Sequence, residues 1–215
     1  MYTLNRILAA AALAVPLVFG LGWSPAAQAQ VYSFGCITAN DTTGTDCNAA
    51  EAQLTLTLTG NASHVLFTFT NVGSVASSIT DIYFGSGLNT SLTGASIING
   101  SGVSFSFDAS PGSLPSGGAY SFSTETDADS NSPTQSNGVN PGETVSFNFL
   151  SSYSATVAAM NTFAYNAVVG IHVQGFANGQ SEALVTTAVP EPETYALMLA
   201  GLGAIAFMAR RRRQR

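Results

Sequence analysis

The chain has 215 residues, a formal net charge of -6 and no lysine, and its six arginines all lie in the two end regions. Residues 31–189 contain ten acidic side chains and neither lysine nor arginine. Because such a segment repels phosphate backbones, the composition disfavours nucleic acid binding, and we expect no nucleic acid partner. Without its two ends the chain keeps about 160 residues, which is enough for one domain with a hydrophobic core.

Residues 1–29 have the layout of a secretory signal peptide. Arg6 supplies the positive charge, residues 7–21 are apolar, and Ala27 and Ala29 form an A-x-A site for signal peptidase. We therefore expect export and a mature chain that begins at Gln30. A retained N-terminal membrane helix is the alternative interpretation.

Cys36 and Cys47 are the only two cysteines, and both lie near the expected mature N-terminus. An even number of cysteines in an exported chain predicts a disulfide. A metal site built on them is disfavoured, since no histidine or further cysteine lies nearby in the sequence.

Apolar and polar residues alternate through most of the region between the two ends, which is typical of strands with one buried face. Leu54, Leu56 and Leu58, for example, alternate with threonines. The expected strands are residues 53–59, 64–70, 77–84, 103–107, 119–125, 144–150, 167–176 and 183–187. Residues 153–163 are the one expected helix, and residues 127–138 are expected to be a long exposed loop. The pattern predicts an all-β fold, an antiparallel β-sandwich of about eight strands.

Catalytic residues are not evident, and we expect no enzyme. His172 is out of phase with the apolar residues of its strand, which favours a hydrogen-bonded sheet histidine. Residues 179–183 approximate a nucleophile elbow around Ser181, but a strand follows where that chemistry needs a helix. This segment is therefore interpreted as a hairpin turn.

Asp127, Asp129 and Asn131 have the D-x-D-x-N spacing that opens a calcium loop. An EF-hand is excluded, because Ser132 and Gly138 occupy the positions of its glycine and its bidentate glutamate. A surface calcium contact through these three residues stays open beside a solvated acidic loop, and calcium is the one cofactor the sequence leaves open.

The C-terminal residues 188–215 form a tail of three parts. The first is a short box, Val189, Pro190, Glu191 and Pro192. Residues 195–209 follow without a charge, and we expect a single transmembrane helix there, short for a bilayer core of about 30 Å. The chain then ends in an arginine cluster that should stay on the cytoplasmic side: Arg210, Arg211, Arg212, Arg213 and Arg215.

This tail resembles the PEP-CTERM tail of Gram-negative bacteria, and residues 167–176 and 178–182 resemble a stretch found in many ectodomains that carry it. The resemblance implies removal of the tail by an exosortase, a transient inner-membrane intermediate, and delivery to the cell envelope or extracellular matrix. It also implies an association with exopolysaccharide, biofilm or floc formation.

We thus expect a signal peptide (residues 1–29), an exported β domain (30–187) and a sorting tail (188–215). The leading interpretation is a non-enzymatic surface or matrix protein. The alternative is a carbohydrate-binding module that retains exopolysaccharide, for which three coplanar tyrosines on one sheet face would be the structural sign. A hydrolase is the third interpretation, and it lacks a recognisable acid pair or triad.

Overall fold

The computed structural model describes residues 29–89, 92–108, 113–115 and 118–187, with the single residues 199, 201, 202 and 205. Ten strands form one sheet in which every pairing is antiparallel, in the order β5-β8-β3-β2-β1-β10-β9-β4-β7-β6. The strands are β1 (Ala29–Cys36), β2 (Leu54–Gly60), β3 (Val65–Asn71), β4 (Ser78–Phe84), β5 (Thr93–Asn99), β6 (Phe105–Phe107), β7 (Ala128–Ser130), β8 (Thr144–Leu150), β9 (Val169–Gln174) and β10 (Glu182–Thr187).

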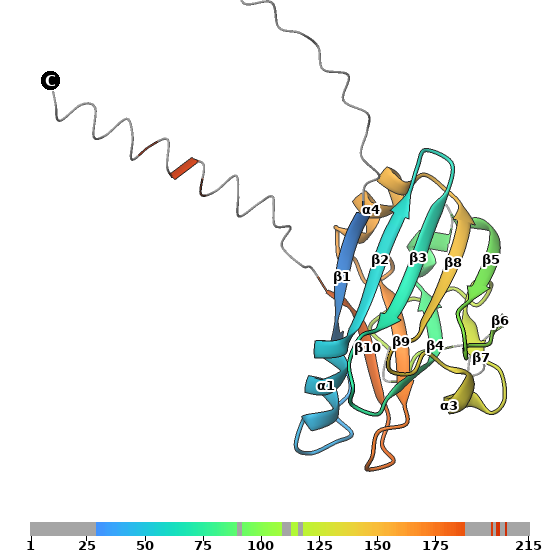
Figure 1. Ribbon diagram of the computed structural model, residues 1–215. Helices are drawn as coiled ribbons and strands as arrows, with labels where there is room; N and C mark the ends of the chain where they lie inside the picture. Colours follow the sequence, from blue (N-terminus) through green and yellow to red (C-terminus); the bar gives the residue numbers. More distant parts are fainter. Residues whose placement is uncertain are drawn as a thin grey trace, which may run out of the picture.

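The sheet folds over so that its two halves face each other across an aromatic core. Figure 1 shows β1, β2, β3, β8 and β5 on the near side, with β10, β9, β4, β7 and β6 behind them. Phe67 and Phe69 on β3 pack edge to face against Phe84 on β4, with ring centroids 5.2 and 6.3 Å apart. Phe147 and Phe149 on β8 also contact Phe84. Alternation along the strands points these rings inward, and their burial holds the halves together.

The expectation of an all-β antiparallel domain is confirmed, but the strand number and the separation into two sheets need correction. The structure has ten strands rather than about eight, and they form one continuous ladder because β1 pairs with both β2 and β10. The far edges, β5 and β6, come close to each other, where the backbone N–H of Phe105 donates to Oδ1 of Asn99 at 2.9 Å. The sheet is therefore nearly closed.

Strands with clear alternation were predicted to within one or two residues at most of their ends, as β2, β3, β4, β8, β9 and β10 illustrate. The expected strand 103–107 is shortened to β6. The expected strand at residues 119–125 is wrong: only an isolated bridge between Gly85 and Phe122 forms there. Three strands were missed, namely β1, β5 and β7.

Four helices are described instead of one: α1 (Thr45–Gln53), α2 (Ser86–Asn89), α3 (Thr134–Asn137) and α4 (Tyr153–Met160). The expected helix at 153–163 corresponds to α4, which begins after Ser152, whose side chain accepts a hydrogen bond from the Ala155 N–H. It ends earlier than expected. The backbone of Phe163 is left-handed, with φ of 49°, and cannot continue a right-handed helix.

The prediction of an exposed loop at residues 127–138 is wrong. Residues 128–130 pair with β4 and β6 as β7, and residues 134–137 form α3. Asp127 is fully buried. The polar composition of this segment concealed a short strand whose Ala128 faces the core.

Strand β4 is buried on both faces, because Leu114 and Phe122 from the connection between β6 and β7 pack over the outside of β4, β9 and β10. Tyr83, Leu114 and Val168 belong to this second apolar cluster. Gly170 on β9 gives this cluster room, since a Cβ at this position would come within 2.8 Å of Leu114 and 2.9 Å of Phe122 and would make these side chains shift.

Within the described part of the chain, no helix combines the length and the apolar character that a membrane crossing requires. The helix expected at residues 195–209 lies almost entirely outside the described residues, so it stays a prediction.

Candidate functional site

The processing residues lie at the ends of the described domain or beyond them. Ala27, the box at residues 189–192 and the arginine cluster at 210–215 are outside the described residues. Ala29 is the first residue of β1 and lies opposite Thr59. At the other end, Thr187 is the last residue of β10 and lies opposite Ser33. Because β1 and β10 are antiparallel neighbours, the domain begins and ends at the same end of this strand pair.

The predicted disulfide is confirmed. Cys36 at the end of β1 and Cys47 in α1 are joined, with their Cα atoms 5.9 Å apart. Among the described residues, Cys36, Cys47 and Glu182 form the one group of three His, Cys, Asp or Glu ligand atoms close enough to share an ion. Both sulfurs are engaged in the disulfide, which leaves the carboxylate alone as a ligand.

Glu182 was not recognised as an important residue in the sequence. It is fully buried at the start of β10 and accepts hydrogen bonds from the Thr38 hydroxyl and from the backbone N–H groups of Asn40 and Asp41, at 2.9 and 3.0 Å for the latter two. The carboxylate therefore holds the loop that follows β1. Residues 175–181 connect the antiparallel strands β9 and β10, so the interpretation of residues 179–183 as a hairpin turn is confirmed.

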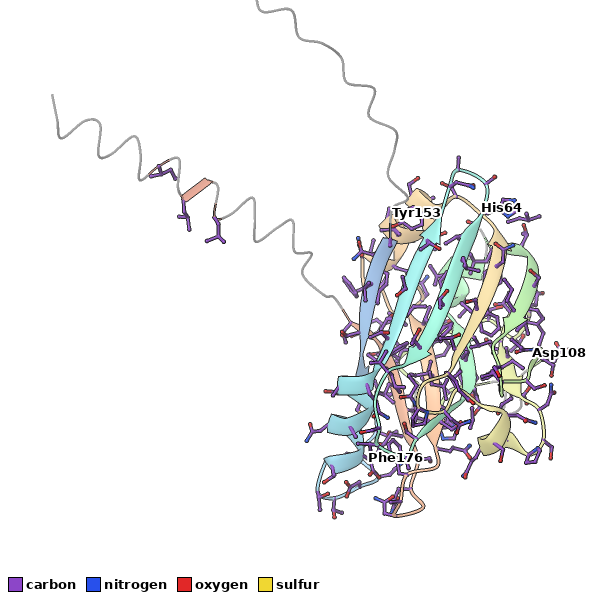
Figure 2. All side chains as sticks on the ribbon, in the orientation of Figure 1. His64, Asp108, Tyr153 and Phe176 are labelled. Carbon is purple, nitrogen blue, oxygen red and sulfur yellow. A yellow bond between two sulfur atoms is a disulfide. The ribbon has the colours of Figure 1, made fainter. Side chains whose placement is uncertain are left out.

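His172 is a hydrogen-bonded sheet histidine, as expected. Its Nδ1 lies 3.1 Å from Oδ2 of Asp81 and 3.3 Å from Nε2 of Gln174. The same Asp81 oxygen accepts a hydrogen bond of 2.7 Å from the Thr80 hydroxyl. Neither partner of the histidine ring is the hydroxyl or thiol that a hydrolase would use as its nucleophile. Figure 2 shows the other histidine, His64, at the outer end of β3, directly before the first residue of that strand.

The three residues of the predicted calcium contact do not come together as a loop. Asn131 is exposed and exchanges hydrogen bonds with the hydroxyls of Ser104 and Ser106. Asp129 lies on β7 opposite Asp81 of β4. Asp127 is fully buried, and neither of its carboxylate oxygens has a hydrogen-bond partner. Burial raises the pKa of Asp127 to about 7, and the nearby backbone N–H of Phe84 opposes this effect only in part.

The most extended candidate surface is the outer face of β5, β8, β3, β2 and β1. Its residues are half-buried or exposed and lie in three rows in register, of which two cross these five strands and the third crosses β8, β3, β2 and β1 and ends on β10. The rows are Ile98, Ser146, Thr68, Thr57 and Val31; Ser96, Asn148, Leu66, Thr59 and Ala29; and Thr144, Thr70, Thr55 and Ser33 with Thr187 of β10. We call these fifteen residues the uncharged face, since none of them carries a charge and most are threonine or serine.

The geometry of the uncharged face is regular because it is set by the sheet. Hydroxyl and methyl groups repeat about every 4.8 Å across the strands and roughly every 6.7 Å along them. Neighbouring hydroxyls also order one another: Oγ1 of Thr68 lies 2.9 Å from Oγ of Ser146. The face can therefore offer hydrogen-bond donors, acceptors and small apolar groups to a neutral partner.

A platform of three coplanar tyrosines is not found among the described residues. Tyr32, Tyr83 and Tyr153 are buried. Tyr120 and Tyr165 remain at the surface, with ring centroids 5.5 Å apart and planes at 67°, so they do not form a flat pair. Tyr165 is 65% exposed.

The described chain is thus an all-β domain with a disulfide beside its first strand, followed in the sequence by a short proline-containing box, an uncharged stretch and an arginine cluster. Residues 188–213 match the family model of the PEP-CTERM protein-sorting motif, as the resemblance of the tail implied. The motif supports export and sorting by an exosortase to the cell envelope or extracellular space. Comparison with curated proteins and with solved structures gives no match.

Proposed function

We propose that this protein is a non-enzymatic component of the cell surface or extracellular matrix, which an exosortase releases from its membrane-anchored precursor. The observation that carries this proposal is the PEP-CTERM motif at residues 188–213, directly after the last strand of the domain. Since β1 and β10 are neighbours, a precursor held by either terminus would be attached at the same end of the domain.

We propose that the uncharged face makes the contact with the matrix. Its partner in this proposal is a neutral polysaccharide. The face has no charge that would favour an ionic polymer, whereas the acidic residues of the domain lie elsewhere. Repulsion by these acids would also disfavour acidic polysaccharides. Hydroxyls at a fixed repeat match the repeated hydroxyls of an extended neutral sugar chain.

The alternative function is a dedicated carbohydrate-binding module centred on aromatic rings. The exposure of Tyr165 beside Tyr120 favours it, because such rings stack on sugars and keep a polar edge in water. The platform is smaller than the uncharged face, and its two rings are not coplanar. This candidate predicts that Tyr165→Ala abolishes sugar binding, whereas changes on the uncharged face leave it intact.

Processing is tested with an epitope-tagged chain expressed in hosts with and without an exosortase. Replacing Pro190, Glu191 and Pro192 by alanine should leave export intact and cause a larger, membrane-bound precursor to accumulate. If the unaltered chain has the same size and cell fraction in both hosts, the tail is not an exosortase substrate and the proposal fails.

Matrix contact is tested separately, by co-sedimentation of the processed protein with the host exopolysaccharide and with purified neutral and acidic polysaccharides. Thr57→Arg places a bulky charge in the centre of the uncharged face and should reduce retention about tenfold. Ala62→Arg, in the exposed turn before β3, is the matched control and should bind normally. Equal retention of both variants would refute the assignment of this face while leaving the sorting proposal untouched.

A further inference from the structure

Three aspartates, Asp81, Asp127 and Asp129, gather on the outer side of β4 and β7, and of the three only Asp81 has a histidine, His172, as its recorded partner. Asp81 and Asp129 are direct partners across the two strands, an arrangement in which like charges repel. Asp127 is two residues before Asp129, so both side chains lie on the same side of the chain. Burial, and then the negative charges of all three aspartates, raise the pKa of Tyr83, which lies next to them on β4.

Asp127 is the member of this cluster whose burial is unexplained. Glu182 is equally buried, but its carboxylate accepts three hydrogen bonds. Both oxygens of Asp127 are buried, and neither meets the geometry of a hydrogen bond, although the backbone N–H of Phe84 is near enough to favour the charged form in part. A buried carboxylate in this state is costly, and it calls for a water or ion that completes the site.

The described part of the chain supplies no compensating charge. Residues 31–189 contain no lysine or arginine, and His172 is already placed against Asp81. Within the domain, a proton or a cation from the solution is left to neutralise Asp127. A proton would leave the repulsion between Asp81 and Asp129 unchanged, whereas a cation held on this side of β7 would reduce it as well.

The geometry points to a binding site for a divalent cation, Ca²⁺, formed by the carboxylates of Asp127 and Asp129 on the outer side of β4 and β7. Ca²⁺ prefers carboxylate and carbonyl oxygens and tolerates irregular geometry. Asn131, the third residue of the sequence motif, is not a ligand, because its side chain is committed to Ser104 and Ser106.

The site contains few protein ligands, and this sets its affinity. The three carboxylates of the cluster do not converge closely enough to share one ion. Two carboxylates, with backbone carbonyls and water completing the shell, correspond to a dissociation constant of roughly 0.1–1 mM, the range of extracellular calcium modules. The backbone N–H of Asp108 donates to the Asp127 carbonyl at 2.9 Å. Asp108 directly follows β6, and Asp127 directly precedes β7. A bound ion would therefore help to fix both ends of the connection between these two strands.

The experiment uses the processed protein, freed of metal with EDTA and then dialysed, and measures Ca²⁺ binding by calorimetry and by the shift of the thermal midpoint. Asp127→Asn keeps the shape of the side chain and removes its charge, and Asp129→Asn does the same at the second ligand. Asp108→Asn is the matched control: Asp108 is a neighbouring exposed acid at the side of the molecule (Figure 2), and its left-handed φ of 73° suits asparagine.

We expect Ca²⁺ to bind the unaltered protein and Asp108→Asn alike, to bind Asp129→Asn at least about tenfold more weakly, and to give no midpoint shift with Asp127→Asn. Circular dichroism and the absence of free thiols establish that each variant is folded. If folded Asp127→Asn binds Ca²⁺ as the unaltered protein does, the ion is held elsewhere and the inference is wrong. Absence of Ca²⁺ binding to the unaltered protein up to about 10 mM, above the range of extracellular modules, would equally overturn it.

Discussion

The imidazole of His172 on β9 and the carboxylate of Asp81 on β4 lie side by side on neighbouring strands, with Nδ1 and Oδ2 3.1 Å apart. The strands shift register between Ile79 and Asp81, and this irregularity sets Asp81 opposite His172. The contact is mostly buried, with 14% of the histidine side chain and 7% of the aspartate side chain exposed. It is the one contact within 4.0 Å between a histidine and a carboxylate that the structure records among the described residues.

We predict that His172→Ala lowers the free energy of unfolding by about 1–3 kcal/mol, because it leaves a buried carboxylate with one partner fewer. Urea denaturation followed by circular dichroism measures the change. His64→Ala is the control: His64 is exposed at the start of β3, and its loss should alter stability by less than about 0.5 kcal/mol. Similar effects of the two substitutions would contradict a structural role for the His172–Asp81 contact.

Glu182→Ala should destabilise the protein by at least about 3 kcal/mol, since a hydroxyl and two backbone N–H groups lose a charged acceptor at once. Glu182→Gln keeps one carbonyl oxygen and should cost less. The backbone amides of Asn40 and Asp41 should then exchange hydrogen faster in native-state measurements. Unchanged protection of these two amides in Glu182→Ala would show that the carboxylate does not hold the loop.

Reduction of the disulfide should cost about 3 kcal/mol, as expected for a short loop between Cys36 and Cys47. Cys36→Ser with Cys47→Ser should reproduce the loss without a reductant. The exported, denatured but unreduced protein should show no free thiol on labelling. Detection of two free thiols would contradict the bond itself.

Asp127 gives the domain a pH dependence in the absence of metal. Its pKa is raised from 3.8 to about 7 in the folded protein, so the folded state binds the proton more tightly than the unfolded state does. The contribution to stability is fully present below pH 4 and is lost as the pH rises to about 7.

Denaturation measured between pH 4 and 8 in EDTA should therefore show this decline for the unaltered protein and a smaller one for Asp127→Asn. The variant should be the more stable of the two at pH 8. Added Ca²⁺ should restore part of the lost stability of the unaltered protein only. Parallel curves for the two proteins would mean that the Asp127 carboxyl is not buried in the folded state.

The pattern of the sequence predicted the strands whose alternation follows burial on one face. Leu54, Leu56 and Leu58 fill the core from β2 while the intervening threonines form part of the uncharged face, so period and burial agree. Strand β5 was missed because it is an exposed edge strand, held by its pairing with β8 and not by an apolar pattern. The strand expected at 119–125 is the opposite case, because this segment has an apolar pattern but does not form a strand. Its Phe122 packs on the outside of β9, close to Gly170.

The polar contacts of the domain could not be predicted from the sequence, because they join residues far apart in the chain. Glu182 meets Asn40 and Asp41 across more than 140 positions, and the sequence near it reads as an ordinary hairpin. Asp127 had been noticed for its spacing to Asp129, but its burial depends on β7 pairing with β4. The disulfide was predictable, since there was no other cysteine to pair with either partner.

The hydrogen bond between Asn99 and the backbone of Phe105 also bears on the association of neighbouring molecules. Asn99 ends β5 and Phe105 begins β6, the two outermost strands of the sheet. Unpaired edges of this kind recruit strands from neighbouring molecules and so start aggregation. The asparagine amide occupies a backbone N–H that a foreign strand would need. Holding the two edge strands against each other at this point should therefore hinder edge-to-edge association of neighbouring molecules.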